Sequence, residues 1–170
     1  MRQLTYGIRR ISKWLARLEL LFCQILIVAF TCLLIANVAS RYVFNNPFYF
    51  ADELSVYMLI WMAFMAICVT IAYNDMIKLS LGVDSLPRPL RRTIEIVIEI
   101  LVLGMLATMF YASIRWIQSP AVAFERAITL DMSKLPFLSI IPIFTGLATF
   151  HVFSNLLTAI FLPDEEVGVK

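Results

Sequence analysis

Residues 54–73 read LSVYMLIWMAFMAICVTIAY and contain no charged side chain. A helix needs roughly 20 predominantly apolar residues to cross the hydrocarbon of a bilayer, so this stretch predicts a helix that spans a membrane. The composition of the whole chain agrees, because 61% of its residues are hydrophobic and only five of 170 are Gly. A chain of this length with so apolar a composition belongs in a bilayer and not among soluble domains.

Three more apolar runs of similar length flank this one, at residues 18–39, 93–114 and 135–162. Only helices and closed barrels satisfy every backbone polar group in lipid, and none of the four runs alternates as a barrel strand does. We therefore predict an all-α integral membrane protein. Its single membrane domain covers residues 1–170, with spans at about residues 18–40, 52–74, 91–117 and 137–162.

The distribution of Lys and Arg predicts the orientation of these spans. Ten of the 14 basic residues lie in the N-terminal segment, in the connection between the second and third spans, or at the C-terminus. Since such residues concentrate on the cytoplasmic side, we expect both termini to face the cytoplasm. The alternative, a cleaved signal peptide in place of the first span, is disfavoured because the apolar run is too long for one.

The first 17 residues form a separate amphipathic segment in this prediction. Leu4, Ile8, Ile11, Leu15 and Leu18 recur at helical spacing, and the basic residues take the other face. This pattern predicts a helix that lies in the headgroup layer before the chain turns into the membrane; a basic flank that only sets the topology is the alternative. The candidate contacts with lipid headgroups are Arg9, Arg10, Lys13, Arg88, Arg91 and Arg92.

Charged residues also share one face at the start of the third predicted span. Arg91, Glu95 and Glu99 follow one another at positions i, i+4 and i+8. Two carboxylates one turn apart repel, and a carboxylate as deep as Glu99 is costly in lipid unless a cation or a protein surface meets it. Three interpretations remain open: a polar seam against a partner subunit, local pairing with Arg at the membrane rim, and a proton or ion site.

Catalytic and cofactor chemistry is not indicated by the sequence. The chain has one His, and its three Cys lie inside predicted spans without metal-ligand spacing. A single His cannot supply the paired axial ligands of a membrane cytochrome, so His151 is interpreted as a packed or interhelical polar residue. Phosphate loops, nucleophile elbows and nucleic-acid patches are also missing. We therefore expect no enzyme activity, no cofactor, no metal and no nucleic-acid partner.

Residues 35–64 read IANVASRYVFNNPFYFADELSVYMLIWMAF and carry a resemblance to a known family. The residues concerned follow in order: Asn37, Arg41-Tyr42, Asn46-Pro47-Phe48, Asp52-Glu53, Leu59-Ile60-Trp61, then Asp84, Leu86 and Pro87, and finally Thr129, Leu130, Pro136 and Pro142. This ordered set resembles the small, Q-type (DctQ-like) membrane subunit of tripartite ATP-independent periplasmic (TRAP) transporters over nearly the whole chain. Met76 and Ser80 depart from the family pattern, which often has His and Asp there, so no role built on those polar residues is carried over.

The resemblance implies a transporter with three components. This chain would be the small scaffold subunit, and its partners would be a large multi-span membrane subunit that carries substrate and sodium, a periplasmic substrate-binding protein, and membrane lipids. The family substrates are mainly carboxylates, including dicarboxylates and sialic acids, taken up by symport. The implied location is the cytoplasmic (inner) membrane of a bacterium or archaeon.

The resemblance and the local chemistry together single out the connection between the first two spans. Asn46 is expected to cap a helix that begins at Pro47, which places Asp52 and Glu53 near a positive helix end. Arg41 is expected within reach of that acidic pair. Two interpretations of this cluster are open. In the first, it fixes the connection between the two spans and contacts a partner. In the second, it only compensates the helix dipoles beneath a belt of aromatic residues. The candidates for interface or structural roles are Asn37, Arg41, Asp52, Glu53, Trp61, Glu95 and Glu99, with Trp61 either an anchor against the large subunit or a packing residue.

A self-sufficient homo-oligomeric four-helix exporter is the alternative function. It would use Glu19, Glu95 or Glu99 as its coupling carboxylate. Glu19 is expected at the cytoplasmic entrance beside Arg17, which is too shallow for a midplane site, and the asymmetric basic residues fix one orientation. Both features disfavour the exporter.

Overall fold

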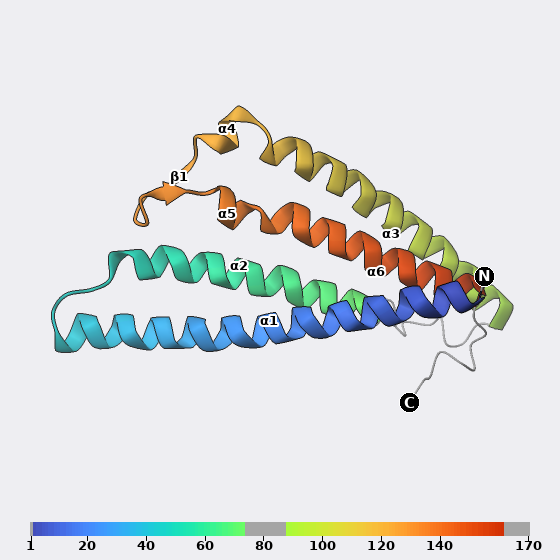
Figure 1. The fold of residues 1–170 in the computed structure, drawn as a ribbon, viewed down its shortest axis with the longest axis horizontal. Helices are drawn as coiled ribbons and strands as arrows, with labels where there is room; N and C mark the ends of the chain where they lie inside the picture. Colours follow the sequence, from blue (N-terminus) through green and yellow to red (C-terminus); the bar gives the residue numbers. More distant parts are fainter. Residues whose placement is uncertain (1, 74–87, 162–170) are drawn as a thin grey trace.

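Four long helices lie side by side in the computed structural model, which describes residues 2–73 and 88–161 (Figure 1). These are α1 (Arg2–Val43), α2 (Tyr49–Ala72), α3 (Arg88–Ile117) and α6 (Ile140–Phe161). All four are long and apolar enough to cross a membrane, the fourth together with the short helix before it. The expected all-α fold with four apolar helices is therefore confirmed.

The connection between α3 and α6 contains short elements that the sequence did not indicate. They are α4 (Pro120–Ala123), β1 (Arg126–Ala127), β2 (Met132–Ser133) and α5 (Leu135–Leu138). The two strands pair antiparallel, with Arg126 opposite Ser133. This hairpin lies at the same end of the bundle as the connection between α1 and α2 (Figure 1). We call this the hairpin end, and the opposite end the N-terminal end.

The first helix differs from the prediction of a separate segment in the headgroup layer. Helix α1 runs without interruption from Arg2 to Val43, so the chain does not turn at residue 17. The local reason is that residues 13–19, KWLARLE, contain neither Gly nor Pro and are mostly strong helix formers. The expected apolar face does exist: Leu4, Ile11 and Leu18 are exposed and point away from the other helices.

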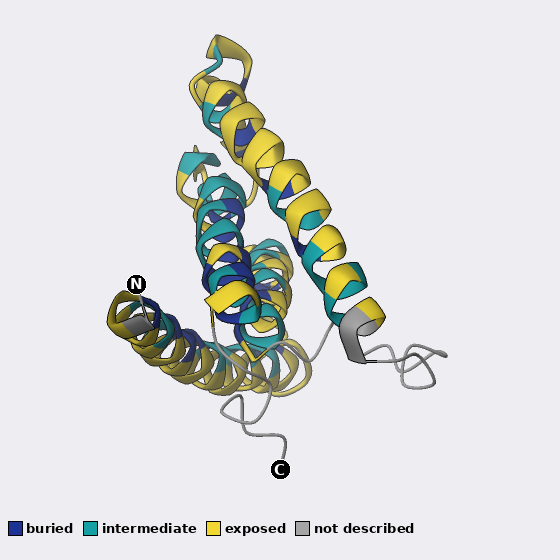
Figure 2. Cartoon of the chain, turned by 90° about the vertical axis from the view of Figure 1, so that its right-hand side faces the viewer, coloured by how far each residue is buried: buried dark blue, intermediate teal, exposed yellow. Residues whose placement is uncertain are grey.

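Helix α6 forms the centre of the bundle. Figure 2 shows it as the helix with the most buried surface, while α1 and α3 are exposed along most of their lengths. Helix α6 packs against α1, α2 and α3. Its Gly146 faces the ring of Phe110 so closely that a Cβ atom would lie 3.0 Å from Cε2. A small residue is needed there because it lets α3 and α6 approach each other.

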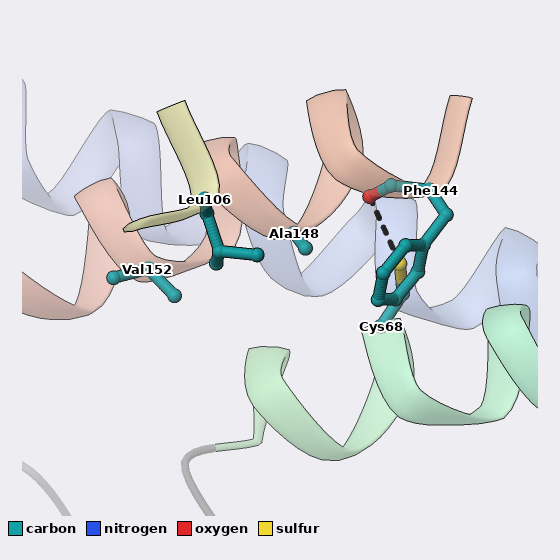
Figure 3. Close-up of a cluster of buried hydrophobic side chains, with 5 residues drawn as sticks. All are labelled: Cys68, Leu106, Phe144, Ala148 and Val152. Carbon is teal, nitrogen blue, oxygen red and sulfur yellow. Dashed lines mark hydrogen bonds between the residues drawn. The ribbon is translucent and has the colours of Figure 1, made fainter. Parts of the chain in front are cut away.

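A small apolar core joins α2, α3 and α6. Its buried members are Cys68, Leu106, Phe144, Ala148 and Val152. Figure 3 shows the Cys68 side chain against the Phe144 ring, with its sulfur 3.7 Å from the Phe144 carbonyl oxygen. This cysteine is a packing residue, as the sequence predicted for an apolar span position.

Several expectations concern residues that lie outside the described ranges. The family positions Met76, Ser80, Asp84, Leu86 and Pro87 belong to residues 74–87. The described part of α3 starts at Arg88 and ends at Ile117, close to the third span predicted at about residues 91–117.

Candidate functional site

The candidate residues of the first connection do meet at the hairpin end. Arg41, in the last turn of α1, lies 3.6 Å from the Asp52 carboxylate in the first turn of α2. The Asn37 side-chain amide donates a hydrogen bond of 3.1 Å to the other Asp52 oxygen. The predicted proximity of Arg41 to the acidic pair is therefore confirmed, and Asn37 is part of the same network.

The cap of α2 comes from α1 and not from Asn46, so the expectation for Asn46 is wrong. Phe48 is the N-cap residue and offers no side-chain cap. Its backbone N–H donates to the Asn37 side-chain oxygen at 3.1 Å. Asn46 is instead tied by its backbone to Ser40, and the residue before it, Asn45, takes a left-handed conformation with a φ of 51°. Asn adopts that conformation more readily than most residues, which explains a turn at this point.

The two neighbouring carboxylates of the acidic pair serve different parts of the fold. Asp52 faces α1, whereas Glu53 accepts a hydrogen bond from the Tyr57 hydroxyl at 3.0 Å. The other Glu53 oxygen accepts from the backbone N–H of Thr129 at 2.8 Å and from the Thr129 hydroxyl. Because Thr129 lies in the turn between β1 and β2, Glu53 fastens the hairpin to α2.

We expect Thr129→Val to loosen the hairpin without disturbing the helices. The change removes the hydroxyl that donates to Glu53 and keeps both the shape of the side chain and the backbone contact. Amide hydrogen exchange of residues 126–133 should become severalfold faster, because local opening controls that exchange. Thr70→Val is the matched control, since its hydroxyl contacts only the carbonyl of Ala66 in its own helix. Unchanged exchange in the hairpin would contradict the fastening role of Glu53.

Trp61 joins three elements near the middle of α2. Its indole N–H donates to the carbonyl of Phe137 at 3.0 Å, and its ring lies 6.0 Å from the ring of Phe22 on α1. One turn earlier, Tyr57 stacks on Phe137 with the ring centroids 4.2 Å apart. These contacts place Trp61 in the packing of this chain, which is the second of the two roles considered for it.

The carboxylates of α3 do not form one exposed seam. Glu99 is only 3% exposed and faces the interior of the bundle, where its Oε2 atom has no hydrogen-bond partner. A residue enclosed in this way cannot meet a partner subunit, so the interpretation as a partner-facing seam is wrong for Glu99. Glu95 is half-buried and has a partner within the structure.

Arg92 binds the end of α6. Its guanidinium donates to the carbonyl of Ala159 at 3.1 and 2.9 Å, and to that of Ile160 at 3.1 Å. The last carbonyls of a helix lack partners within the helix and carry partial negative charge, which explains why a cation is stabilising there. Arg92 therefore has a structural role in addition to any contact with lipid. Of the other headgroup candidates, Arg10 and Lys13 are exposed and Arg9 is half-buried.

We expect Arg92→Lys to fray the last turn of α6. Lysine keeps the positive charge, but it lacks the planar guanidinium with which arginine donates to two carbonyl oxygens at once. The substitution should lower the stability of this contact by about 1 kcal/mol. This is less than the usual contribution of a hydrogen bond to a charged group, because the site is partly exposed. Hydrogen exchange in residues 156–161 measures this change. Arg115→Lys, in the last turn of α3 and exposed, should have no such effect.

A second polar cluster lies inside the bundle, between α1 and α6. Ser12 Oγ is 2.7 Å from His151 Nδ1, and His151 Nε2 is 3.1 Å from Glu19 Oε1. Glu19 is thus buried opposite the middle of α6, and the expectation of a shallow position near the end of the bundle is wrong. The interpretation of His151 as an interhelical polar residue is confirmed.

The chain matches the family model described as "Tripartite ATP-independent periplasmic transporters, DctQ component" over residues 30–162. The chain belongs to this family. No curated protein matches it. The family predicted from the ordered motif residues is therefore confirmed, and the protein is a DctQ component of a TRAP transporter system.

The DctQ match covers the network at the hairpin end but not the whole of the buried cluster. Asn37, Arg41, Asp52, Glu53 and Trp61 all lie within the matched residues. His151 also does, whereas Ser12 and Glu19 precede the match. The buried cluster therefore joins the family region to the N-terminal half of α1.

The polar contacts described in this DctQ component join one part of the chain to another. Within residues 2–73 and 88–161, no group of three or more His, Cys, Asp or Glu residues is placed to hold a metal ion. Most charged groups described at the hairpin end bind one another or backbone atoms: Arg41, Asp52, Glu53, Glu125, Arg126, Asp131 and Lys134. Three cysteines are free thiols, and of these Cys68 is buried.

Proposed function

We propose that this DctQ component is a non-catalytic small permease subunit that braces the large membrane subunit of a TRAP transporter. In this proposal the complex takes up an organic acid of the carboxylate or sialic acid class together with sodium. The family assignment supports a role as a transporter component. The large subunit carries substrate and ions, and the small subunit supplies no substrate chemistry.

The uncovered apolar surface of α1 and α3 is the observation that carries this proposal. Only 6% of the most apolar window of α1 and 11% of that of α3 are buried by the rest of the chain, against 33% for the fourth span. A helix that is apolar around its circumference needs lipid or another protein around it. Two such helices on one small bundle offer a broad surface on which a multi-span partner can pack.

The proposed subunit lies in the cytoplasmic membrane with both termini in the cytoplasm. Its basic residues are concentrated at the N-terminus and at the start of α3, at the same end of the bundle (Figure 1). The positive-inside rule assigns that end to the cytoplasm. The hairpin end then faces the periplasm.

The proposed docking surface for the periplasmic binding protein is the hairpin end. Arg126 and Asp131 form an ion pair of 3.4 Å there, and both side chains are mostly exposed. The apolar side chains of Phe124 and Ile128 are also exposed in the same segment. Charges at the rim of an interface affect the rate of association and its salt dependence. The charge-reversal variant Arg126→Glu should therefore slow uptake at limiting binding protein, while leaving assembly with the large subunit intact.

A pull-down tests the proposed assembly directly. The tagged chain is expressed with its chromosomal neighbours, extracted in a mild detergent and analysed by mass spectrometry. We expect a stoichiometric multi-span membrane protein, with a periplasmic binding protein encoded nearby. Recovery of the chain alone as a discrete homo-oligomer would overturn the scaffold proposal. The exporter alternative is not carried forward, because the family is one of transporter components.

A further inference from the structure

The cluster of Ser12, Glu19 and His151 is almost completely enclosed by protein. The exposed fractions of these residues are 2%, 5% and 0%. Ser12 and Glu19 lie on the same face of α1, two turns apart, and both contact the one imidazole ring that α6 provides. No part of the proposed scaffold function requires two titratable groups at this place.

The charged and titratable groups around the cluster are few in the described residues. From α1 the Cys23 thiol lies near Glu19, and from α2 the Cys68 thiol does. Arg17 is exposed and lies on a different face of α1 from Glu19. On α3, Glu99 interacts with Glu95 of its own helix. His151 is the basic group that pairs with Glu19.

The hydrogen bonds constrain where the protons of the cluster lie. An anionic Glu19 beside a neutral His151 would leave a net negative charge in the interior, which costs several kcal/mol without further partners. One additional proton makes the cluster neutral. Glu19 Oε2 has no hydrogen-bond partner, and an unpartnered oxygen costs less as the carbonyl of a carboxylic acid than as half of a carboxylate.

We propose that Glu19 and His151 form a proton-binding site, and that the bound proton latches the N-terminal half of α1 to α6. In the latched state, Glu19 Oε1 carries the proton and donates to His151 Nε2. His151 Nδ1–H donates to Ser12 Oγ. When the proton leaves to water, Glu19 becomes an anion, the ring proton moves to Nε2, and Ser12 donates to Nδ1. This proposal does not depend on the proposed transport function.

The latch predicts that α1 loosens from α6 on the alkaline side. With the proton bound, the cluster carries no net charge. As the pH rises, loss of the proton places a charge between α1 and α6, and separation of the helices lets water reach it. The Glu19→Gln variant should remain latched as the pH is raised, because the amide can still donate to His151 Nε2 and cannot ionise.

Nitrogen NMR of His151 tests the protonation state. The chain contains a single His, so labelling histidine with ¹⁵N gives one imidazole signal pair without assignment. The full chain in lipid nanodiscs at neutral pH should show a neutral ring with its proton on Nδ1. Glu19→Gln should keep this tautomer. An imidazolium signal, with both nitrogens protonated, would overturn the proposal in favour of a charged pair.

Distance measurements between spin labels test the latch itself. A Cβ atom added at Gly7 on α1 or at Gly104 on α3 meets no atom within 4 Å, so Gly7→Cys and Gly104→Cys can carry labels in a chain whose native cysteines are replaced. We expect one narrow distance at neutral pH, lost as the pH is raised. Glu19→Gln should retain the narrow distance.

The matched control for this measurement is Glu99→Gln. Glu99 is the other buried carboxylate with an unpartnered Oε2 in the described residues, and it lies on α3. This variant should lose the narrow distance at high pH as the wild-type chain does. A narrow distance at high pH in the wild-type chain, or the same loss in Glu19→Gln, would overturn the latch.

Discussion

Trp61→Ala is expected to lower the free energy of unfolding by about 2–3 kcal/mol. The change removes the ring that packs on Phe22 and leaves the Phe137 carbonyl without its donor. Truncating a buried Trp in a soluble protein costs about 3–5 kcal/mol. The expected value here is lower because Trp61 is half-buried and because lipid tails replace some of the lost apolar contact. Unfolding by a denaturing detergent in mixed micelles measures the difference.

Two further variants separate the ring packing of Trp61 from its hydrogen bond. Trp61→Phe keeps an aromatic ring and loses only the donor, so it should cost about 1 kcal/mol. Trp116→Ala is the matched control, because Trp116 lies on the exposed side of α3. If Trp61→Ala destabilises the isolated chain no more than Trp116→Ala, the internal packing role of Trp61 is contradicted. A defect that appears only in complex assembly would instead assign Trp61 to the interface.

Asn37→Leu should destabilise the hairpin end by about 2 kcal/mol. The substitution keeps the volume but removes the acceptor for the Phe48 N–H and the donor to Asp52. The part-buried Phe48 N–H loses its acceptor, and a buried donor without a partner costs about 1–3 kcal/mol, whereas the exposed Asp52 carboxylate can turn to water. The helix α2 then starts without a cap. The unfolding midpoint in detergent and the hydrogen exchange of residues 48–52 report this loss.

The matched control for Asn37 is another amide on the same helix. Gln24 is exposed, and within the described residues no hydrogen bond joins it to the chain. Gln24→Leu should therefore leave the stability of the isolated chain unchanged. Equal effects of the two substitutions would mean that the loss of polarity in α1, and not the cap of α2, controls stability.

The spans and the family could be predicted because each depends on many residues at once. An apolar run such as residues 54–73 has no alternative to a membrane helix. The ordered residues of the first connection were read correctly as a family signature, and the approach of Arg41 to Asp52 followed from their places at two adjoining helix ends. Local sequence and helix geometry were sufficient for these features.

The contacts between distant segments could not be predicted in the same way. Ser12 and His151 are 139 positions apart, and Glu53 and Thr129 are 76 positions apart. The amphipathic pattern of the first helix was also misleading. In a bilayer the polar side chains Ser12 and Glu19 turn inward and the apolar ones turn outward, which reverses the rule for soluble proteins. A short buried polar residue such as Ser12 gives no signal of its own.

The unbroken α1 behaves mechanically as a stiff rod, and two of its polar contacts act as supports. A helix of 42 residues is about 63 Å long, roughly twice the thickness of the hydrocarbon layer. One support is the contact of Asn37 with α2, and the other is the contact of Glu19 with α6, about 27 Å away along the rod. A rod held at two points cannot pivot at one of them alone. A displacement imposed on the tip at the hairpin end must therefore either move the tip at the N-terminal end in the opposite direction or release one of the supports.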